Sequence, residues 1–276
     1  MKKAFFLFTG EFGYEIISFQ GILRKLRSNF ETLYVCSYKE SKIFYEDFVD
    51  KFVEIPEWFL SKFDRSDSLN TMSDEDINKL VGEYENDGFN VYHRRKIFND
   101  YPLDIKLDLT GDFGKYPPLN TKKNQNENII TLFPRIHTTH EHRNYNINKF
   151  NIFLEKIIKQ FVGFEINVVL FNDNFQSDLT KVNYIIRPDI KTQLNLQAVS
   201  KFVIYNVSGS VFLNVMNSEK TPIFMYGIKS DLEKFPENNI FTKKGINYKY
   251  VFETDNVSDI EPEYLFDSLI DFYKTV

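Results

Sequence analysis

Residues 202–227, FVIYNVSGSVFLNVMNSEKTPIFMYG, decide the fold class of this chain. The apolar run Phe202–Asn206 predicts a β-strand, and Pro222–Gly227 predicts a second strand. Between them lie a glycine-containing turn and a short helix predicted at Ser210–Asn217. A strand, a helix and a second strand in this order are typical of a parallel sheet with crossover helices. The stretch therefore predicts an α/β fold.

The rest of the second half repeats this alternation. Strands are predicted at Ile129–Phe133, Ile166–Phe171 and Tyr184–Ile186, and helices at Asn146–Phe161, Asp189–Lys201 and Glu261–Lys274. In the last helix, Pro262 occupies the first turn, where proline is well tolerated. Together these elements predict a Rossmann-like domain.

The first half begins with a similar unit. A strand is predicted at Ala4–Phe8 and another at Thr32–Cys36, with the turn TGEFG and an amphipathic helix between them. Further along, a helix is predicted at Ser73–Asn86, with Ser73 as its cap, and strand-like segments at Asn90–His93 and Asp104–Leu109. The first half is therefore also predicted to be Rossmann-like.

A polar segment separates the two halves. Pro117 and Pro118 are followed by LNTKKNQNEN, which has no apolar periodicity and is typical of a linker. We expect two domains, residues 1–125 and 126–276. Ligands of such folds usually bind in a cleft between the domains.

Composition excludes several protein classes. The chain has 276 residues, 42% of them hydrophobic, which suffices for buried cores. The net charge of −5 argues against nonspecific binding of nucleic acid, so no nucleic-acid partner is expected.

The single cysteine, Cys36, excludes an internal disulfide and fits a reducing cytosol. No segment approaches the ~20 apolar residues of a membrane span, so we expect a soluble cytoplasmic protein.

The turn Asn206–Ser210 is a candidate phosphate site. It follows a strand and begins a helix, so backbone N–H groups and the hydroxyls of Ser208 and Ser210 converge there. The alternative is a well-capped turn with no ligand. The lysine of a P-loop is absent, which argues against ATP binding of that kind.

The segment TLFPRIHTTHEHRNYNINKF, residues 131–150, holds three of the four histidines between Arg135 and Arg143. Three interpretations are open: a metal site of His137, His140 and His142, a polar loop without a ligand, or an anion site. The histidine spacing matches no H-E-x-x-H motif, whereas guanidinium groups bind phosphate oxygens bidentately. We favour the anion site.

Two carboxylates lie in the first glycine turn. Glu11 and Glu15 are near the predicted cleft, where one of them could act as a general base. Alternatively, they neutralise the start of the helix. Gly10, Gly13 and Gly21 do not have the G-x-G-x-x-G spacing of a dinucleotide fingerprint.

These motifs resemble a known family. Residues 202–227 are similar to the donor-binding domain of GT-B glycosyltransferases, especially the heptosyltransferase-like group, with its strand, SGS-type turn and helix. FPRIHTTHEHRNYN resembles a strand-end segment of related glycosyltransferase-like proteins. FTGEFGYEIISFQGILRKL resembles the N-terminal strand, glycine turn and helix, where this group has an acidic catalytic residue shortly after a glycine. Asn206 replaces the aspartate that the family usually has before its donor turn.

The resemblance implies two Rossmann-like domains facing across a cleft and a metal-independent glycosyltransferase. It makes Glu15 the catalytic base, with Glu11 as the second choice. The nucleotide sugar, a co-substrate, is expected to bind Arg135, Arg143, Asn206, Ser208, Gly209 and Ser210. Other substrate contacts are expected from Gly10, Gly13, Tyr14 and His137. No metal or cofactor is implied, and the acceptor is expected to be a hydroxyl group, most simply of a glycan.

Two other functions fit the same residues. A noncatalytic protein with this frame would bind a nucleotide or a glycan without turnover. A metallohydrolase would use the histidine cluster to hold zinc or manganese. Metal content and nucleotide binding distinguish the three.

Overall fold

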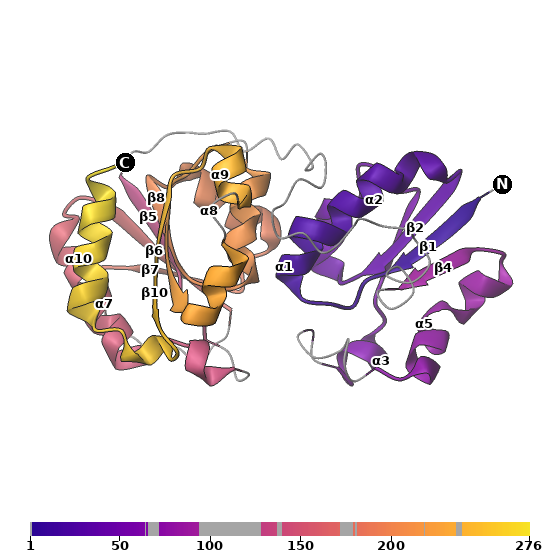
Figure 1. Cartoon of the computed structure of the whole chain (residues 1–276), viewed down its shortest axis with the longest axis horizontal. Helices are drawn as coiled ribbons and strands as arrows, with labels where there is room; N and C mark the ends of the chain where they lie inside the picture. Colours follow the sequence, from indigo (N-terminus) through magenta and orange to yellow (C-terminus); the bar gives the residue numbers. More distant parts are fainter. Residues whose placement is uncertain are drawn as a thin grey trace. The chain divides into compact units, whose positions relative to one another are not determined.

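The computed structural model describes residues 2–63, 65, 72–93, 128–136, 140–171, 179, 181–217, 219–235 and 239–276. The chain divides into two compact units, Met1–Pro117 and Pro118–Val276, each with its own parallel sheet (Figure 1). The domain boundary predicted near residue 125 and the strand predicted at Asp104–Leu109 lie within residues 94–127, outside the described residues. Both stay predictions.

The second unit is built on a six-stranded parallel sheet with the order β10-β9-β8-β5-β6-β7. Its strands are β5 (Ile129–Phe133), β6 (Glu165–Leu170), β7 (Asn183–Ile186), β8 (Phe202–Asn206), β9 (Ile223–Ile228) and β10 (Tyr248–Thr254). Numbered within the unit, this order is 6-5-4-1-2-3, that of a doubly wound Rossmann fold. The winding direction reverses between β5 and β8, where such folds bind ligands at the carboxyl ends of the strands.

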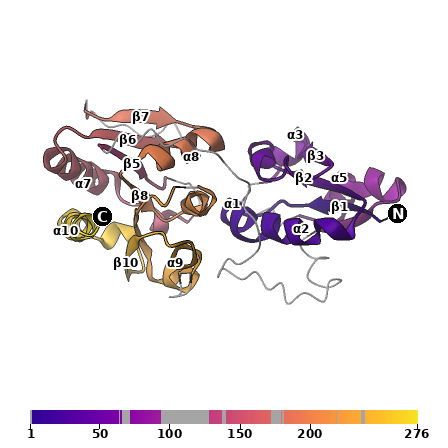
Figure 2. The same ribbon diagram turned by 90° about the horizontal axis from the view of Figure 1, so that it is seen from above.

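Helices cover both faces of this sheet (Figure 2). On one face lie α7 (Ile147–Gln160) and α10 (Pro262–Tyr273), and on the other α8 (Ile190–Val199) and α9 (Ile240–Lys244). The side chain of Asn146 caps α7 by accepting bonds from the N–H groups of Asn148 (2.9 Å) and Lys149 (3.2 Å). Apolar residues three and four apart on α7 then pack against α10 and the sheet, and they include Phe150, Phe153, Leu154 and Ile157. The predicted helices are thus confirmed, with ends shifted by one or two residues.

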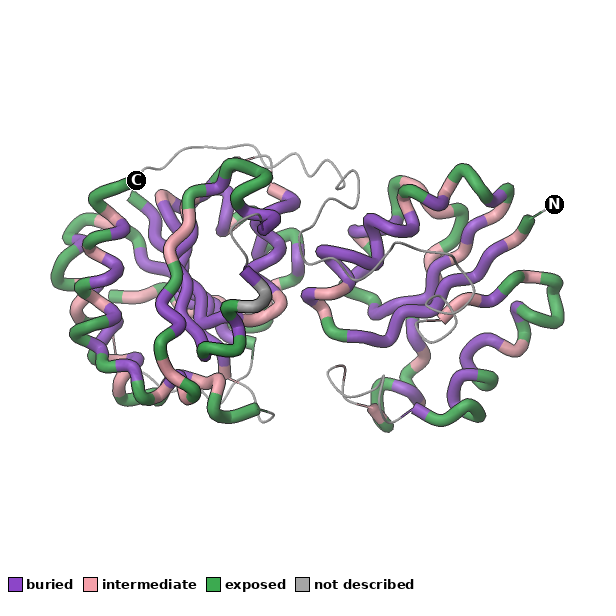
Figure 3. The backbone as a smooth tube through the Cα atoms, in the orientation of Figure 1, coloured by how far each residue is buried: buried purple, intermediate pink, exposed green. Residues whose placement is uncertain are grey.

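The first unit has a four-stranded parallel sheet with the order β3-β2-β1-β4. Its strands are β1 (Lys3–Leu7), β2 (Thr32–Ser37), β3 (Lys51–Glu54) and β4 (Asn90–His93). On one face, Phe5 and Leu7 of β1 pack into a core with α3 (Glu57–Leu60) and α5 (Asp74–Asn86). The inner strands, such as β1 in the first unit and β5, β8 and β9 in the second, are buried along most or all of their length (Figure 3).

The helix after β1 is continuous but changes its winding. It begins as α1 (Phe12–Tyr14), passes through a π-helical turn, η1 (Glu15–Phe19), and continues as α2 (Gln20–Leu26). Turns of this kind occur often at functional sites. Here the π-helical turn starts at Glu15, one of the two predicted catalytic carboxylates.

The structure adds two strands that the sequence did not predict. β3 and β10 are edge strands, and residues such as Lys51, Glu54 and Tyr250 are exposed on them. Edge strands lack the continuous apolar run of a strand buried on both faces. None of the helices in the described part of the chain combines the length and apolar character that a bilayer crossing needs.

Candidate functional site

In the second unit, the switch point between β5 and β8 brings two predicted segments together. The loop after β5 contains Arg135 and Arg143, and the turn after β8 contains Ser208–Ser210. Because β5 and β8 are adjacent and parallel, these segments leave the sheet side by side at its carboxyl edge. The sequence placed these residues at strand ends, and the strand order makes the two strand ends neighbours.

The turn after β8 is compact and partly open. Ser208 begins η5 (Gly209–Met216), a 3₁₀-helix, with an extended backbone at φ −148°. The hydroxyl groups of Ser208 and Ser210 are hydrogen bonded to each other at 2.8 Å. Ser208 and Gly209 are half-buried, whereas Ser210 is buried. The turn therefore has hydroxyl groups and N-terminal N–H groups that can bind an anion.

Asn206, the last residue of β8, has a structural role in this arrangement. Its side chain is 1% exposed, accepts a bond from the N–H of Tyr145 (3.3 Å) and donates one to the carbonyl of Tyr226 (3.4 Å). It therefore connects the loop after β5 to strand β9. An aspartate at this position could accept the first bond but could not donate the second.

Arg143 spans the carboxyl end of β8. It belongs to η4 (Glu141–Arg143), after β5, and its Nη2 donates to Asp231 at 2.6 Å, in η6 (Lys229–Lys234), after β9. Since β8 lies between β5 and β9 in the sheet, this ion pair lies over the end of β8. The side chain of Arg143 is 20% exposed, and its Nε is buried and has no hydrogen-bond acceptor among the described residues. The guanidinium group is thus fixed in place and retains donor capacity.

Asp231 depends on a nearby glycine. Its carboxylate is 1% exposed and also accepts a bond from the N–H of Ile228 (3.4 Å). A Cβ atom at Gly227 would lie 2.8 Å from the Oδ2 of Asp231 and 2.9 Å from the ring of Phe252. Gly227 therefore leaves the room in which Asp231 can reach Arg143.

Arg135 closes the loop after β5. Its Nη1 donates to the side-chain oxygen of Asn144 (2.6 Å) and to the carbonyl of His140 (3.3 Å), and it is 8% exposed. Arg135 thus sets the shape of the loop that carries Arg143. The predicted substrate residue His137 lies outside the described residues.

The histidines provide no metal site in the described part of the chain. The rings of His140 and His142 are 6.1 Å apart, and both residues are exposed. Among the described residues, no group of three or more His, Cys, Asp or Glu side chains is arranged to hold a metal ion.

In the first unit, the structure separates the two predicted carboxylates. Glu15 is completely buried, and it accepts hydrogen bonds from the hydroxyls of Ser41 (2.6 Å) and Tyr45 (2.7 Å). It also accepts bonds from the Ser37 hydroxyl and the Arg65 guanidinium group. Burial raises the pKa of Glu15, while Arg65 and the three hydroxyls act in the opposite direction.

Glu11, in contrast, is exposed. It directly precedes α1 at the carboxyl edge of the sheet, and its side chain makes no capping bond to the helix. The neighbouring Gly10 and Gly13 are buried, and Tyr14 is half-buried. Of the two carboxylates, Glu11 is the one that solvent reaches.

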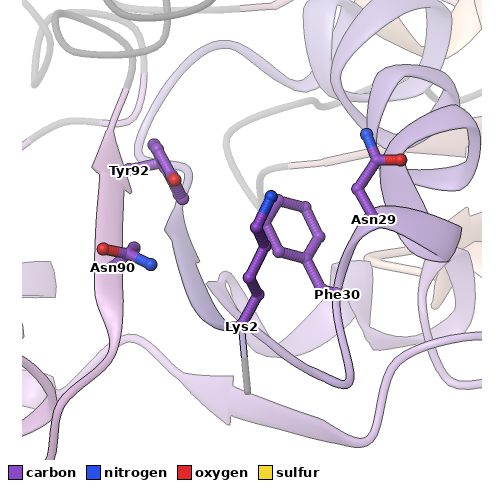
Figure 4. A pocket seen from close by; sticks show the side chains of 5 residues that line it. All are labelled: Lys2, Asn29, Phe30, Asn90 and Tyr92. Carbon is purple, nitrogen blue, oxygen red and sulfur yellow. The ribbon is translucent and has the colours of Figure 1, made fainter.

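A cavity of about 420 Å³ lies at the opposite, amino edge of this sheet (Figure 4). It is lined by Lys2, Asn29, Phe30, Asn90 and Tyr92, most of which precede or begin strands. Ligands of doubly wound sheets bind at the carboxyl edge, and this cavity lies at the other end of the sheet from Glu11, which follows the carboxyl end of β1.

Comparison with solved structures shows the fold. A family 9 glycosyl transferase from Veillonella parvula superposes with a TM-score of 0.64 at 10% identity, covering 100% of this chain and 98% of that chain. The ADP-heptose LPS heptosyltransferase II of E. coli gives 0.61 at 11% identity, with 99% of each chain covered. The E. coli heptosyltransferase WaaC with ADP-2-deoxy-2-fluoro heptose gives 0.62 at 9% identity, covering 98% of this chain and 99% of that one. The chain has the GT-B fold.

The resemblance that the sequence motifs predicted is confirmed at the level of this GT-B fold. No protein-family model and no curated protein matches the sequence itself.

The sequence did not predict several polar residues that contact Glu15 and Arg143. Arg65 and Asp231, the ion-pair partners of Glu15 and Arg143, lie in polar segments without a recognisable motif. The hydroxyls that surround Glu15 come from β2 and the segment after it, and no sequence spacing relates them to Glu15. The signal that could have indicated these residues is the number of polar side chains just after the predicted strands.

Proposed function

We propose that the protein is a metal-independent glycosyltransferase that moves a sugar from a nucleotide-sugar donor to a hydroxyl group of an acceptor, most simply a glycan. The observation that carries this proposal is the ion pair of Arg143 over the end of β8, the strand that the Ser208–Ser210 turn follows, at the switch point of a GT-B sheet. Two of the similar structures contain ADP and ADP-2-deoxy-2-fluoro heptose, so an ADP-sugar is the first donor to test.

The donor diphosphate is proposed to bind in the second unit. The hydroxyls of Ser208 and Ser210 and the N–H groups at the start of η5 bind one phosphate, and the guanidinium group of Arg143, whose side chain is 20% exposed, binds the other. When the bond between the sugar and the diphosphate breaks, negative charge develops on the leaving oxygen. A fixed guanidinium group stabilises that charge without reorganisation.

The acceptor hydroxyl loses its proton to a carboxylate of the first unit. The family resemblance of the N-terminal motif favoured Glu15 as this base, with Glu11 second. We reverse that preference, because a base must come within about 3 Å of the proton that it removes. Glu11 is exposed, whereas Glu15 is fully buried and already accepts bonds from four side chains. We therefore propose Glu11 as the base and Glu15 as part of its support.

A thermal-shift screen tests the donor site. ADP, UDP, GDP, CMP and dTDP and their common sugars, beginning with ADP-heptose, are added with and without EDTA. We expect one nucleotide to raise the melting temperature in both conditions, because ligand at about 100 times its dissociation constant adds about 2.7 kcal/mol of stability. Destabilisation by EDTA, with no response to any nucleotide, would instead support a metal site and contradict the proposal.

Release of the nucleoside diphosphate tests the chemistry. With the donor found in the screen, the Glu11→Gln variant is expected to release it at least about 100-fold more slowly than the wild type, since a general base contributes about 10²–10⁴. The melting temperature should not change, because Glu11 is exposed and makes no capping bond. Binding without any release by the wild-type protein would favour a noncatalytic nucleotide-binding protein.

A further inference from the structure

Arg65 has an unusually large set of partners in the first unit. Its Nη1 donates to Glu40 at 2.7 Å, its Nη2 donates to Glu15, and its Nε donates to the carbonyl of Gly10 at 3.3 Å. Its guanidinium carbon is 4.1 Å from the ring centre of Tyr38 and 4.8 Å from that of Phe12. All three nitrogens of the side chain are therefore in use, and the charge lies against two aromatic rings.

The Glu15 end of this network is anchored in the core. Glu15 is completely buried, and the hydroxyls of Ser37, Ser41 and Tyr45 hold its two oxygens from β2 and the segment after it. These hydrogen bonds fix the Glu15 carboxylate in one position. The guanidinium group of Arg65, which donates to that carboxylate, is therefore fixed as well.

The hydrogen bond from the Nε of Arg65 to the carbonyl of Gly10 fixes the backbone next to Glu11. The carbonyl of Gly10 belongs to the peptide unit that joins Gly10 to Glu11, and that unit is planar. The residue after Glu11, Phe12, contributes a ring to the same guanidinium group. Arg65 thus contacts both neighbours of Glu11, whose own side chain makes no capping bond that would orient it.

We propose that Arg65 is a positioning residue that holds the Gly10–Phe12 turn and so directs the carboxylate of Glu11; this inference rests on the proposed function, in which Glu11 is the base. The role requires arginine. A planar group with five donors can bind two carboxylates and a carbonyl in different directions while it stacks on rings, and the single ammonium group of lysine cannot.

The variant Arg65→Lys tests this role, because it keeps the charge next to Glu15 and loses the planar fork. Arg24→Lys is the matched control in the same unit. Arg24 donates to both oxygens of Asp47 (2.6 and 2.7 Å) and to the carbonyl of Phe44 (3.0 Å), and it lies 4.2 Å from the ring centre of Phe48. Its partners in the described part of the chain are Gln20, Phe44, Asp47 and Phe48 and do not include Gly10 or Phe12, so it reports the general cost of replacing a multiply bonded arginine.

With the donor found in the screen, Arg65→Lys is expected to lower kcat about 100-fold, as small misplacements of catalytic groups do, and to leave KM for the donor unchanged. Arg24→Lys should stay within twofold of the wild type. In the Glu11→Gln background, Arg65→Lys should reduce kcat little further, because both changes remove the same function. Equal losses in the two lysine variants, or an undiminished loss in the Glu11→Gln background, would overturn the proposal.

Hydrogen exchange measures the same role without turnover. Peptides covering residues 9–15 should exchange faster in Arg65→Lys than in the wild type, and Arg24→Lys should leave them unchanged. Unchanged exchange in Arg65→Lys would overturn the proposal even if the protein is a glycosyltransferase. If the wild type shows no transfer, the proposed function fails, and the exchange experiment still decides whether Arg65 holds the turn.

Discussion

The two units each place an arginine–carboxylate pair just beyond the carboxyl edge of a parallel sheet, and the two pairs differ in what remains available. In the first unit, every nitrogen of Arg65 has a partner, and Glu15 is fully buried. In the second unit, Arg143 is paired with Asp231, its side chain is 20% exposed, and its buried Nε has no acceptor among the described residues. A saturated pair holds protein structure, whereas an unsaturated one can bind a ligand. This difference is why we assign Arg65 to positioning and Arg143 to the donor.

The largest expected effect is that of removing Arg143. Arg143→Ala is expected to lower kcat about 10²–10³-fold, the usual cost of losing a preorganised donor to a developing charge. It should also cost roughly 3–5 kcal/mol of unfolding free energy, because it removes the arginine of the ion pair that the buried Asp231 carboxylate makes. Steady-state kinetics and denaturant unfolding measure the two effects.

A double variant separates these effects. Arg143→Gln combined with Asp231→Asn removes both charges of the ion pair together. We expect the unfolding free energy of the double variant to be closer to that of the wild type than the unfolding free energy of Arg143→Ala is. Its kcat should be as low as that of Arg143→Ala. Recovery of turnover together with stability would show that Arg143 is structural, and the two pairs would then be alike.

The next largest effect is expected from replacing Gly227, because a side chain at this position would collide with Asp231. Gly227→Ala would place a Cβ atom 2.8 Å from the carboxylate, so we expect a loss of about 1–3 kcal/mol and weaker donor binding. Gly82→Ala is the control, since nothing lies within 4 Å of its added Cβ and Gly82 lies inside α5. It should stabilise the protein by roughly 0.5–1 kcal/mol. Equal unfolding midpoints for the two variants would contradict this account of Gly227.

The smallest effect on turnover is expected for Glu15→Gln. The amide keeps the shape of the side chain, and Glu40 and the carbonyl of Gly10 still hold Arg65, so kcat should fall by less than about tenfold, or 1.4 kcal/mol. A loss as large as that of Glu11→Gln would make Glu15 the base after all.

Glu15→Gln should also change the pH dependence of stability. The pKa of Glu15 is raised above its ordinary value of 4.5, so above that pH the folded state binds more protons than the unfolded state. The unfolding free energy of the wild type relative to the variant should therefore fall as the pH rises from 4.5, and level off above the folded-state pKa. Urea unfolding at a series of pH values measures this difference, and a relative stability that rises with pH would contradict the raised pKa.

Much of the fold could be predicted from local patterns. Strands β5 and β8 match their predicted bounds residue for residue, because both are short apolar runs that are buried along their whole length. The cap of α5 was also predicted: Asp76 and Ser73 exchange bonds between side chain and backbone. The edge strands β3 and β10 were not predicted, because polar and charged residues at their exposed positions interrupt the apolar run that marks a buried strand.

By itself, the sequence determined the α/β class, the positions of most strands and helices, and the turns at which functional side chains gather. These properties depend on residues that are neighbours in the chain or lie a helical turn apart. Only the tertiary structure decided that Arg143 reaches Asp231 across the end of β8, that Arg65 joins Glu15 to the carbonyl of Gly10, and that Glu11 is exposed while Glu15 is buried. Those contacts join residues 50 to 88 positions apart. Strand order and side-chain burial create such contacts, and no local spacing encodes them.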